Sequence, residues 1–335
     1  MAMKRATFCV YILCALLFIC SCSSDPQKSA LRELERRKIP FTEQKFLEKA
    51  YEGDTDAVKQ FISAGINKEA RTAEDGYTAL IIAAHAGHAE IIRMLVDKGS
   101  DVNTTDNTGI TALMRAAFNG HADCVKVLLD SGAEANLIAT GQRGMTALMF
   151  AASAGQAEVV RLLLAKGAYP DIRSTDGNQA LMYAQLSGNA ETVALLTSSS
   201  PNINTPNDKQ INALHIAIKR HEPQQAAILI TKGANVNTSD ATGFTPLMLA
   251  CQEGEAATAK LLIVYGAFVN ATYNTNGRTI TPLMIAAMKG HESVVRLLVK
   301  MNADKSIQDG QGNNAASYAR HNGFEYIARM IEGRD

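Results

Sequence analysis

Apolar residues recur along most of the chain in two alternating patterns. In one, such as residues 113–119, small alanines and larger apolar residues form a short stretch that predicts a closely packed helix. In the other, such as residues 157–164, apolar residues stand at helical spacing, which predicts an amphipathic helix. A glycine usually follows each stretch, as expected where a helix ends in a left-handed residue. A polar turn such as residues 103–109 then leads to the next copy.

Each copy opens with Thr-Ala-Leu, Thr-Pro-Leu or a close variant of these. The openings stand at Thr78, Thr111, Thr146, Gln179, Asn212, Thr245, Thr281 and Asn314, and are 33, 35, 33, 33, 33, 36 and 33 residues apart. The motif and the period resemble the ankyrin repeat family, whose unit is about 33 residues long and opens with Thr-Pro-Leu-His-x-Ala.

The resemblance covers residues 41–335 and implies an all-α repeat solenoid. About nine stacked ankyrin repeats are expected, each a helix-turn-helix with a β-turn finger. Stacked repeats need polar ends, which places an N-terminal cap at about residues 41–74 and a C-terminal cap at about residues 311–335.

Two kinds of departure from the repeat pattern stand out. The fingers at residues 136–143 and 270–279 are longer than the others by two and three residues. Residues 197–201 and 221–223 lack the glycines that end helices elsewhere. We therefore expect a weak joint near residues 197–223 that opens before the rest of the array.

The N-terminus has the features of an export signal. Lys4 and Arg5 precede an apolar run over residues 6–19, which is too short to span a bilayer comfortably and fits a secretory signal. Residues 19–22, Ile-Cys-Ser-Cys, resemble a bacterial lipobox. This resemblance implies a signal peptide over residues 1–21 and a lipid on Cys22. Because Cys20 is uncommon at its position, ordinary secretion and an uncleaved anchor remain alternatives.

Residues 22–40 are polar, which predicts a lipid-anchored tether. As a coil this segment would span roughly 25 Å, and fully extended about 60 Å. We expect the protein in a bacterial cell envelope, facing the periplasm or the cell surface.

Composition limits the possible partners. The 33 basic and 33 acidic residues balance, so the chain has no excess positive charge for a nucleic-acid backbone. Four of the six cysteines lie within residues 1–22, the expected signal and the lipidated Cys22. Cys124 and Cys251 are expected roughly 40 Å apart, too far for a disulfide, and to be small buried hydrophobic residues.

A search for catalytic motifs predicts no catalytic residue, metal or cofactor. Residues 310–315 match a dinucleotide-binding string but lie in a finger rather than between a strand and a helix. His85 and His88 supply too few ligands for zinc. The resemblance implies instead that histidines following a repeat glycine, His88, His121 and His291, bond to neighbouring backbone. An enzyme would need titratable residues clustered on fingers, where Asp75, Asp106, Asp176, Asp208 and Asp240 recur, but aspartate there favours a turn-forming role.

The resemblance implies that a partner protein binds the fingers and the concave face of the inner helices. Carried over to this chain, the family's positions predict partner-binding residues in two rows: Tyr77, Ile110, Met145, Ile211, Phe244 and Ile280 before the motif, and Phe118 and Leu186 before the inner-helix glycine. An exposed apolar stripe would mark an interaction site. The alternative is that these side chains tuck under their own fingers.

We therefore expect a monomeric, non-catalytic envelope lipoprotein that binds a partner protein and meets the membrane through the lipid on Cys22. The alternatives are a periplasmic immunity protein that neutralises a toxin, and an ankyrin effector secreted toward a host.

Overall fold

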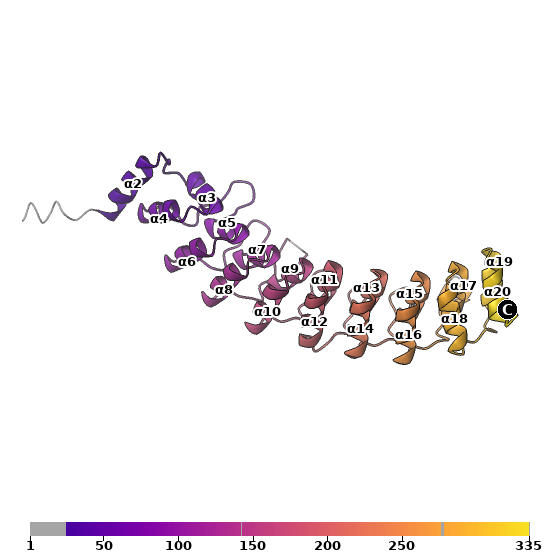
Figure 1. The fold of residues 1–335 in the computed structure, drawn as a ribbon. Coiled ribbons are helices and arrows are strands. Elements are labelled where there is room, and N and C mark those ends of the chain that lie inside the picture. Colours follow the sequence, from indigo (N-terminus) through magenta and orange to yellow (C-terminus); the bar gives the residue numbers. More distant parts are fainter. Residues whose placement is uncertain (1–24, 142, 276–277, 335) are drawn as a thin grey trace, which may run out of the picture. The chain divides into compact units, whose positions relative to one another are not determined.

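The computed structural model describes residues 25–141, 143–275 and 278–334. The expected signal peptide and Cys22 lie outside these residues. The described chain contains helix α2 and then nine helix pairs, each made of an inner and an outer helix (Figure 1). The inner helices are α3 (Glu43–Glu52), α5 (Ala79–Ala86), α7 (Ala112–Asn119), α9 (Ala147–Ser153), α11 (Ala180–Ser187), α13 (Ala213–Lys219), α15 (Pro246–Glu253), α17 (Pro282–Lys289) and α19 (Ala315–His321). The outer helices are α4 (Thr55–Ser63), α6 (Ala89–Asp97), α8 (Ala122–Asp130), α10 (Ala157–Ala165), α12 (Ala190–Ser199), α14 (Pro223–Thr231), α16 (Ala256–Val264), α18 (Glu292–Lys300) and α20 (Glu325–Glu332). This is the all-α repeat fold that the sequence predicts.

The chain divides into two compact units. Among the described residues, unit 1 comprises residues 25–116 and 126–133, and unit 2 comprises residues 117–125 and those from 134 to 334. Within unit 1, α3 packs on α5 and α4 packs on α6. Within unit 2, the inner helices from α9 to α19 pack in sequence order, and so do the outer helices from α10 to α20. Each unit is therefore a two-layered stack of helix pairs.

The opening threonine of the motif is the N-cap of the inner helix. The Thr78 hydroxyl accepts a hydrogen bond from the Ile81 N–H, and Thr146, Thr245 and Thr281 do the same in their repeats. A capping side chain of this kind stabilises a helix by about 1 kcal/mol. Gly87, with a φ of 86°, ends α5 in the left-handed conformation that the sequence predicts.

Residues 26–36 form helix α2 (Pro26–Arg36) rather than the coil expected for a tether. Asp25 caps the helix by accepting a hydrogen bond from the Gln27 N–H at 3.2 Å. Ala30 and Leu34 are 2% and 1% exposed, and the helix packs on α4. Two apolar residues suffice here because they cover an existing helix and need not build a core of their own.

Polar contacts also hold α2 in place. The Arg37 guanidinium donates to both carboxylate oxygens of Asp54, at 3.2 and 2.6 Å, and the Gln27 side chain donates to the Ala64 carbonyl at 2.9 Å. The N-terminal cap therefore begins at α2 and not at residue 41.

Asparagine side chains join the turns that follow successive outer helices. The Asn136 side chain donates to the Gly167 carbonyl at 3.1 Å and accepts from the Tyr169 N–H at 2.8 Å. Asn204 and Asn237 make the same pair of bonds to the turn one repeat further on. We call these three residues the asparagine clamps. Each of them joins the turns of two neighbouring repeats by hydrogen bonds.

The longer finger at residues 270–279 contains a small antiparallel hairpin. Its strands are β1 (Tyr273–Thr275) and β2 (Arg278–Ile280), and Tyr273 is opposite Ile280. The Tyr273 ring packs edge-on against Phe244 of the preceding finger, with ring centroids 4.8 Å apart. The extra residues therefore add a strand pair that rests on its neighbour.

Residues 197–223 lack glycine caps, as the sequence indicates, and the structure adds buried polar groups nearby. The residue after α12, Ser200, is extended, and His221 adopts a φ of 56°, a conformation that costs a non-glycine residue roughly 1 kcal/mol. Both polar atoms of the Gln185 side chain are buried without a hydrogen-bond partner among the described residues. One side-chain oxygen of Thr192 and one of Gln225 are likewise buried without a hydrogen-bond partner among the described residues. These features support a weak joint, whose early opening stays a prediction.

Candidate functional site

The row of apolar residues before the motif is largely buried. Ile110, Met145 and Ile280 are only 2%, 8% and 7% exposed, so they offer a partner almost no surface. Each finger closes above its residue: the Asp106 N–H donates to the Ile110 carbonyl at 2.9 Å, and the Ala139 N–H to the Met145 carbonyl at 3.0 Å. The binding role of these three residues stays a prediction, and their burial favours the alternative that the side chains tuck under their own fingers.

The remaining members of that row are half-buried. Tyr77, Ile211 and Phe244 are each partly accessible to solvent. One edge of Phe244 is covered by Tyr273. The predicted continuous apolar stripe is therefore broken into separate half-buried side chains.

The second predicted row contains the exposed residues. Phe118 on α7 and Leu186 on α11 are 49% and 46% exposed. The Phe118 ring contacts Phe150 edge-to-face, with centroids 6.3 Å apart. An exposed aromatic side chain supported by a second ring has a defined orientation, and such residues are enriched at interface centres.

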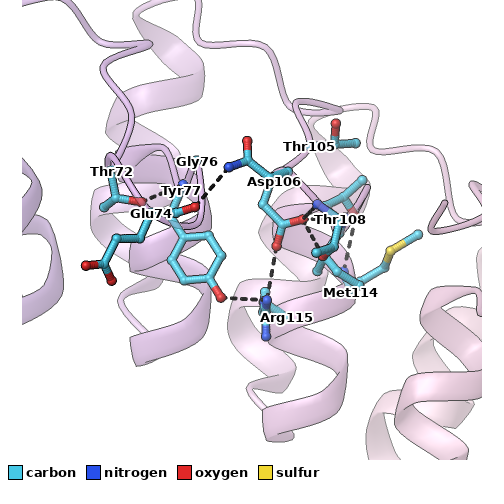
Figure 2. Close-up of polar contacts among 12 residues, drawn as sticks. Thr72, Glu74, Gly76, Tyr77, Thr105, Asp106, Thr108, Met114 and Arg115 are labelled. Atoms are coloured by element: carbon cyan, nitrogen blue, oxygen red, sulfur yellow. Dashed lines mark hydrogen bonds and ion pairs between the residues drawn. The ribbon is translucent and has the colours of Figure 1, made fainter. Parts of the chain in front are cut away.

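A polar cluster links the first two fingers of unit 1. The Arg115 guanidinium donates to the Tyr77 hydroxyl at 2.8 Å and to the Asp106 carboxylate at 3.0 Å (Figure 2). It also lies over the Tyr77 ring, 5.0 Å from the centroid. Since Tyr77 and Arg115 belong to consecutive repeats, the cluster fixes one finger against the next.

Asp106 is the electrostatic centre of this cluster. Burial by itself would raise the pKa of its carboxyl group, but the N–H groups of Ile110 and Thr108, the Thr108 hydroxyl and Arg115 outweigh burial and lower the pKa. The carboxylate therefore stays charged and folds its own finger by accepting these hydrogen bonds.

The five recurrent aspartates do not share one position in the fingers. Asp106 and Asp240 begin their fingers and accept backbone N–H groups two and four residues ahead, which confirms the turn-forming role for these two. Asp75, Asp176 and Asp208 lie further along their fingers, where Asp208 pairs with Arg173. Similar spacing along the sequence concealed this difference in register.

A groove lies between α3 and the first finger, in unit 1. Its volume is about 820 Å³. We call it the N-terminal groove. It is lined by Glu43, Gln44, Leu47, Glu48, Tyr51, residues 71–75, Tyr77 and Ile82.

The described contacts of two histidines and two cysteines are those of structural residues. The side chains of His88 and His291 contact the carbonyls of Tyr51 and Gln252 in the preceding repeat, both at 2.9 Å, as the resemblance implies. Burial raises the pKa of the Cys124 thiol to about 11, with a smaller contribution from Asp123.

Burial also raises the pKa of the Cys251 thiol, which is 0% exposed. Both cysteines are therefore the buried hydrophobic residues that were predicted. Within the described ranges, no three His, Cys, Asp or Glu side chains are grouped closely enough to hold a metal ion.

Sequence reasoning missed Arg115, Phe150 and Tyr51 as site residues. Arg115 had a signal: it is the one charged residue at the fifth position of the eight motif copies. Tyr51 lies before the first motif, in a helix interpreted only as a cap, although it is 61% exposed.

Comparison with known proteins covers nearly all of the repeat region. A family model described as ankyrin repeats in three copies matches residues 46–139, 134–207, 199–273 and 272–333. An ankyrin repeat-containing protein of Schizosaccharomyces pombe, P1E11.10, is 38% identical over 57 residues, which are 17% of this chain and 27% of that protein. The chain therefore matches little more than a quarter of the length of this relative.

No helix among residues 25–141, 143–275 and 278–334 combines the length and the apolar character needed to cross a membrane. The helix pairs, the capping threonines and the fingers agree with the family match over its whole extent. The chain belongs to the ankyrin repeat family.

Proposed function

We propose that this protein is a non-catalytic scaffold that binds a partner protein through its inner helices and fingers. The observation that carries this proposal is the exposure of Phe118 and Leu186 on inner helices of unit 2, at 49% and 46%. A partner that covers these side chains removes apolar surface from water, which favours binding.

Reactive side chains elsewhere in the described chain also favour binding over catalysis. The polar groups of the fingers, such as Asp106, are engaged in folding their own turns. The thiols of Cys124 and Cys251 are buried and have raised pKa values, so neither is an effective nucleophile at neutral pH.

The test is affinity capture with two matched double variants. Phe118→Ser with Leu186→Ser removes the exposed inner-helix residues. As the control, Tyr169→Ser with Val264→Ser removes side chains that are even more exposed, 65% and 66%, one in the turn after α10 and one at the end of α16. Circular dichroism first establishes that both variants fold. A protein that the wild type and the control retain and the inner-helix variant loses supports the proposal. Equal capture by all three forms would refute this surface as the binding site.

We also propose that the scaffold is a bacterial envelope lipoprotein, anchored through a lipid on Cys22. Residues 1–22 support this through the charged start, the apolar run and the lipobox-like Ile-Cys-Ser-Cys. Since α2 begins at Pro26, only four residue steps, about 14 Å at full extension, separate Cys22 from the folded domain. The domain would then lie close to the membrane surface, which a tether of about 60 Å would not require.

Metabolic labelling with a clickable palmitate analogue tests the anchor. We expect label in the wild type and in Cys20→Ala, and none in Cys22→Ala. Equal label in Cys22→Ala and the wild type would exclude Cys22 as the lipidated residue, and an unlabelled, soluble wild type would indicate ordinary secretion.

A further inference from the structure

We propose that the N-terminal groove is a receptor for a basic segment of a partner protein, in which a lysine or arginine side chain lies between α3 and the first finger. This inference rests on the proposed scaffold function and adds the chemistry of the partner. It concerns unit 1, whereas Phe118 and Leu186 lie in unit 2.

The groove has four carboxylates on its rim. Glu43 and Glu48 come from α3, and Glu74 and Asp75 come from the tip of the first finger. Arg71 is the only basic residue that lines it. The charge of the lining is therefore strongly negative, which repels phosphate-rich ligands and attracts cations.

The four carboxylates differ in how far they are already neutralised. Both carboxylate oxygens of Glu48 accept hydrogen bonds from the Lys45 ammonium group at 2.7 Å, and this contact lowers the pKa of Glu48. Glu43 accepts one bond from the Asn67 amide at 3.2 Å. Among the described residues, the Glu74 and Asp75 carboxylates have neither a cation nor a hydrogen-bond donor as partner. The finger tip therefore carries the uncompensated charge.

Neighbouring contacts hold this tip in position. The Asn107 side chain donates to the Glu74 carbonyl at 3.0 Å, and the Asn107 N–H donates to the Asp75 carbonyl at 3.0 Å. Gly76, with a φ of 70°, lies so close to Asn107 that a Cβ there would be 2.3 Å from its side-chain oxygen. The two carboxylates are thus presented by a fixed loop, which reduces the entropy lost on binding.

Arg71 does not neutralise the tip, because its guanidinium is used elsewhere. It donates to the Gly76 carbonyl at 3.1 Å, to the Thr105 carbonyl at 2.6 Å and to the Thr104 hydroxyl at 3.0 Å. Figure 2 shows the Glu74 carboxylate directed away from Arg115, the other guanidinium of this region. Both arginines form hydrogen bonds that join neighbouring fingers, and neither neutralises the Glu74 or Asp75 carboxylate.

The lining of the groove is partly apolar and aromatic. Leu47 and Ile82 contribute buried side chains, 7% and 8% exposed, and Tyr51 contributes an aromatic residue that is 61% exposed. Lysine and arginine have apolar stems that pack on such a surface while the charged head stays among carboxylates. A cation close to the face of the Tyr51 ring gains a further attraction. This combination fits a basic side chain better than a small inorganic cation.

The shape and size of the groove favour a peptide segment. A volume of about 820 Å³ lies within the range of pockets that hold a ligand of a few side chains, roughly 300–1,000 Å³. Residues of both α3 and the first finger line it, so a segment bound there would contact both elements, with one basic side chain among the carboxylates.

Binding of two defined octapeptides to the full-length chain tests this inference. The probe GSLKLRSG is compared with GSLELESG, each labelled with fluorescein and measured by fluorescence anisotropy at 50 and 500 mM NaCl. We expect the basic peptide to bind at least tenfold more tightly at low salt, and this preference to shrink at high salt because the charges at the rim are exposed.

Two matched double variants locate the site. Glu74→Gln with Asp75→Asn should weaken the basic peptide roughly five- to tenfold, as expected for the loss of two surface charge pairs. Glu90→Gln with Asp97→Asn removes the same charge from α6 and should change binding less than about twofold. Tyr51→Ala should also weaken binding of the basic peptide.

Each result decides for or against the groove. Equal binding of both peptides, no binding of the basic peptide at millimolar concentration, or an unchanged affinity in the Glu74/Asp75 variant would overturn the inference. Capture of a partner that depends on Phe118 and Leu186 would still support the scaffold function in those cases, so the two proposals fail separately.

Discussion

The Arg115 guanidinium joins the hydroxyl and the ring face of Tyr77, 38 residues earlier in the chain, to the buried carboxylate of Asp106. One side chain thereby couples two consecutive fingers. The Asp106 carboxylate is 1% exposed, so it depends on its partners for stability.

Replacing this arginine should destabilise unit 1. In Arg115→Met the Asp106 carboxylate loses its cation but keeps the N–H groups of Thr108 and Ile110. We expect the free energy of unfolding, measured by urea titration, to fall by about 1–3 kcal/mol. The double variant with Asp106→Asn should lose less than the sum of the two single variants, because the two residues share one interaction. Strict additivity would contradict the coupling.

Helix α2 should behave as a structural cap of the array. Leu34 is 1% exposed on α4, so Leu34→Ala should cost about 2–4 kcal/mol locally and raise hydrogen exchange in α2 and α4. Leu31→Ala changes a neighbouring leucine that is not fully buried and serves as the control. Rapid exchange of α2 already in the wild type would show that this helix does not cap unit 1.

Gln185 should be a stability defect. The same motif position is Ala84, Ala117, Ala152, Cys251 and Ala287 in other repeats, all apolar and buried. The Gln185 amide is buried without a partner among the described residues, a situation that costs about 1–3 kcal/mol per unmade group. Gln185→Met keeps the volume and removes both polar atoms, so it should raise the free energy of unfolding by about 1–3 kcal/mol.

Gln185→Ala is the matched comparison, since it removes the same polar atoms but leaves a cavity. It should stabilise less than the methionine variant. Hydrogen exchange near residues 197–223 should slow in Gln185→Met if this region opens first. A destabilised methionine variant, or uniform exchange across all repeats in the wild type, would contradict the weak joint.

The C-terminal cap should lose stability in acid because of Asp309. Burial by itself would raise the pKa of this carboxyl group, but the Tyr318 hydroxyl and the N–H groups of Asn313 and Gln311 outweigh it and hold the pKa at about 2. In the unfolded chain the pKa is about 4, so the unfolded state binds more protons between these values. The stabilisation is complete above about pH 5 and is lost as the pH falls toward 2.

Asp309→Asn removes this titration and should flatten the pH dependence of the cap's unfolding between pH 5 and 2. The change is followed by hydrogen exchange or by thermal melts at several pH values. Asp97→Asn, at an exposed position on α6, is the charge-matched control and should keep the wild-type slope. An identical slope in Asp309→Asn and the wild type would exclude Asp309 as the source.

The repeats could be predicted because their signals are local. Thr78 caps the helix that follows it, and Gly87, nine residues after Thr78, ends that helix, so both act within one repeat. Following the same short signals down the chain identifies the eight helix pairs from α5 to α20. The fold class follows directly, since such pairs bury their apolar faces only by stacking.

Exposure at the site could not be predicted in the same way, because it depends on contacts between fingers, helices and repeats. Ile110 and Phe118 are both apolar and eight residues apart, yet one lies beneath a closed finger and the other faces solvent. Helix α2 was missed for a related reason: Leu34 gains its burial from α4, which the local sequence does not reveal. The charge of Arg115 among apolar motif residues was the one readable signal of the cluster.

The asparagine clamps have a consequence for how such a protein changes over generations. Asn136, Asn204 and Asn237 each hold the turn of the following repeat through its backbone, the Gly167 carbonyl for example, and so make few demands on the side chains there. A gene duplication that copies one repeat also copies its connector. The array is therefore free to gain or lose modules, and to diversify its surface, while the join between adjacent modules is inherited intact.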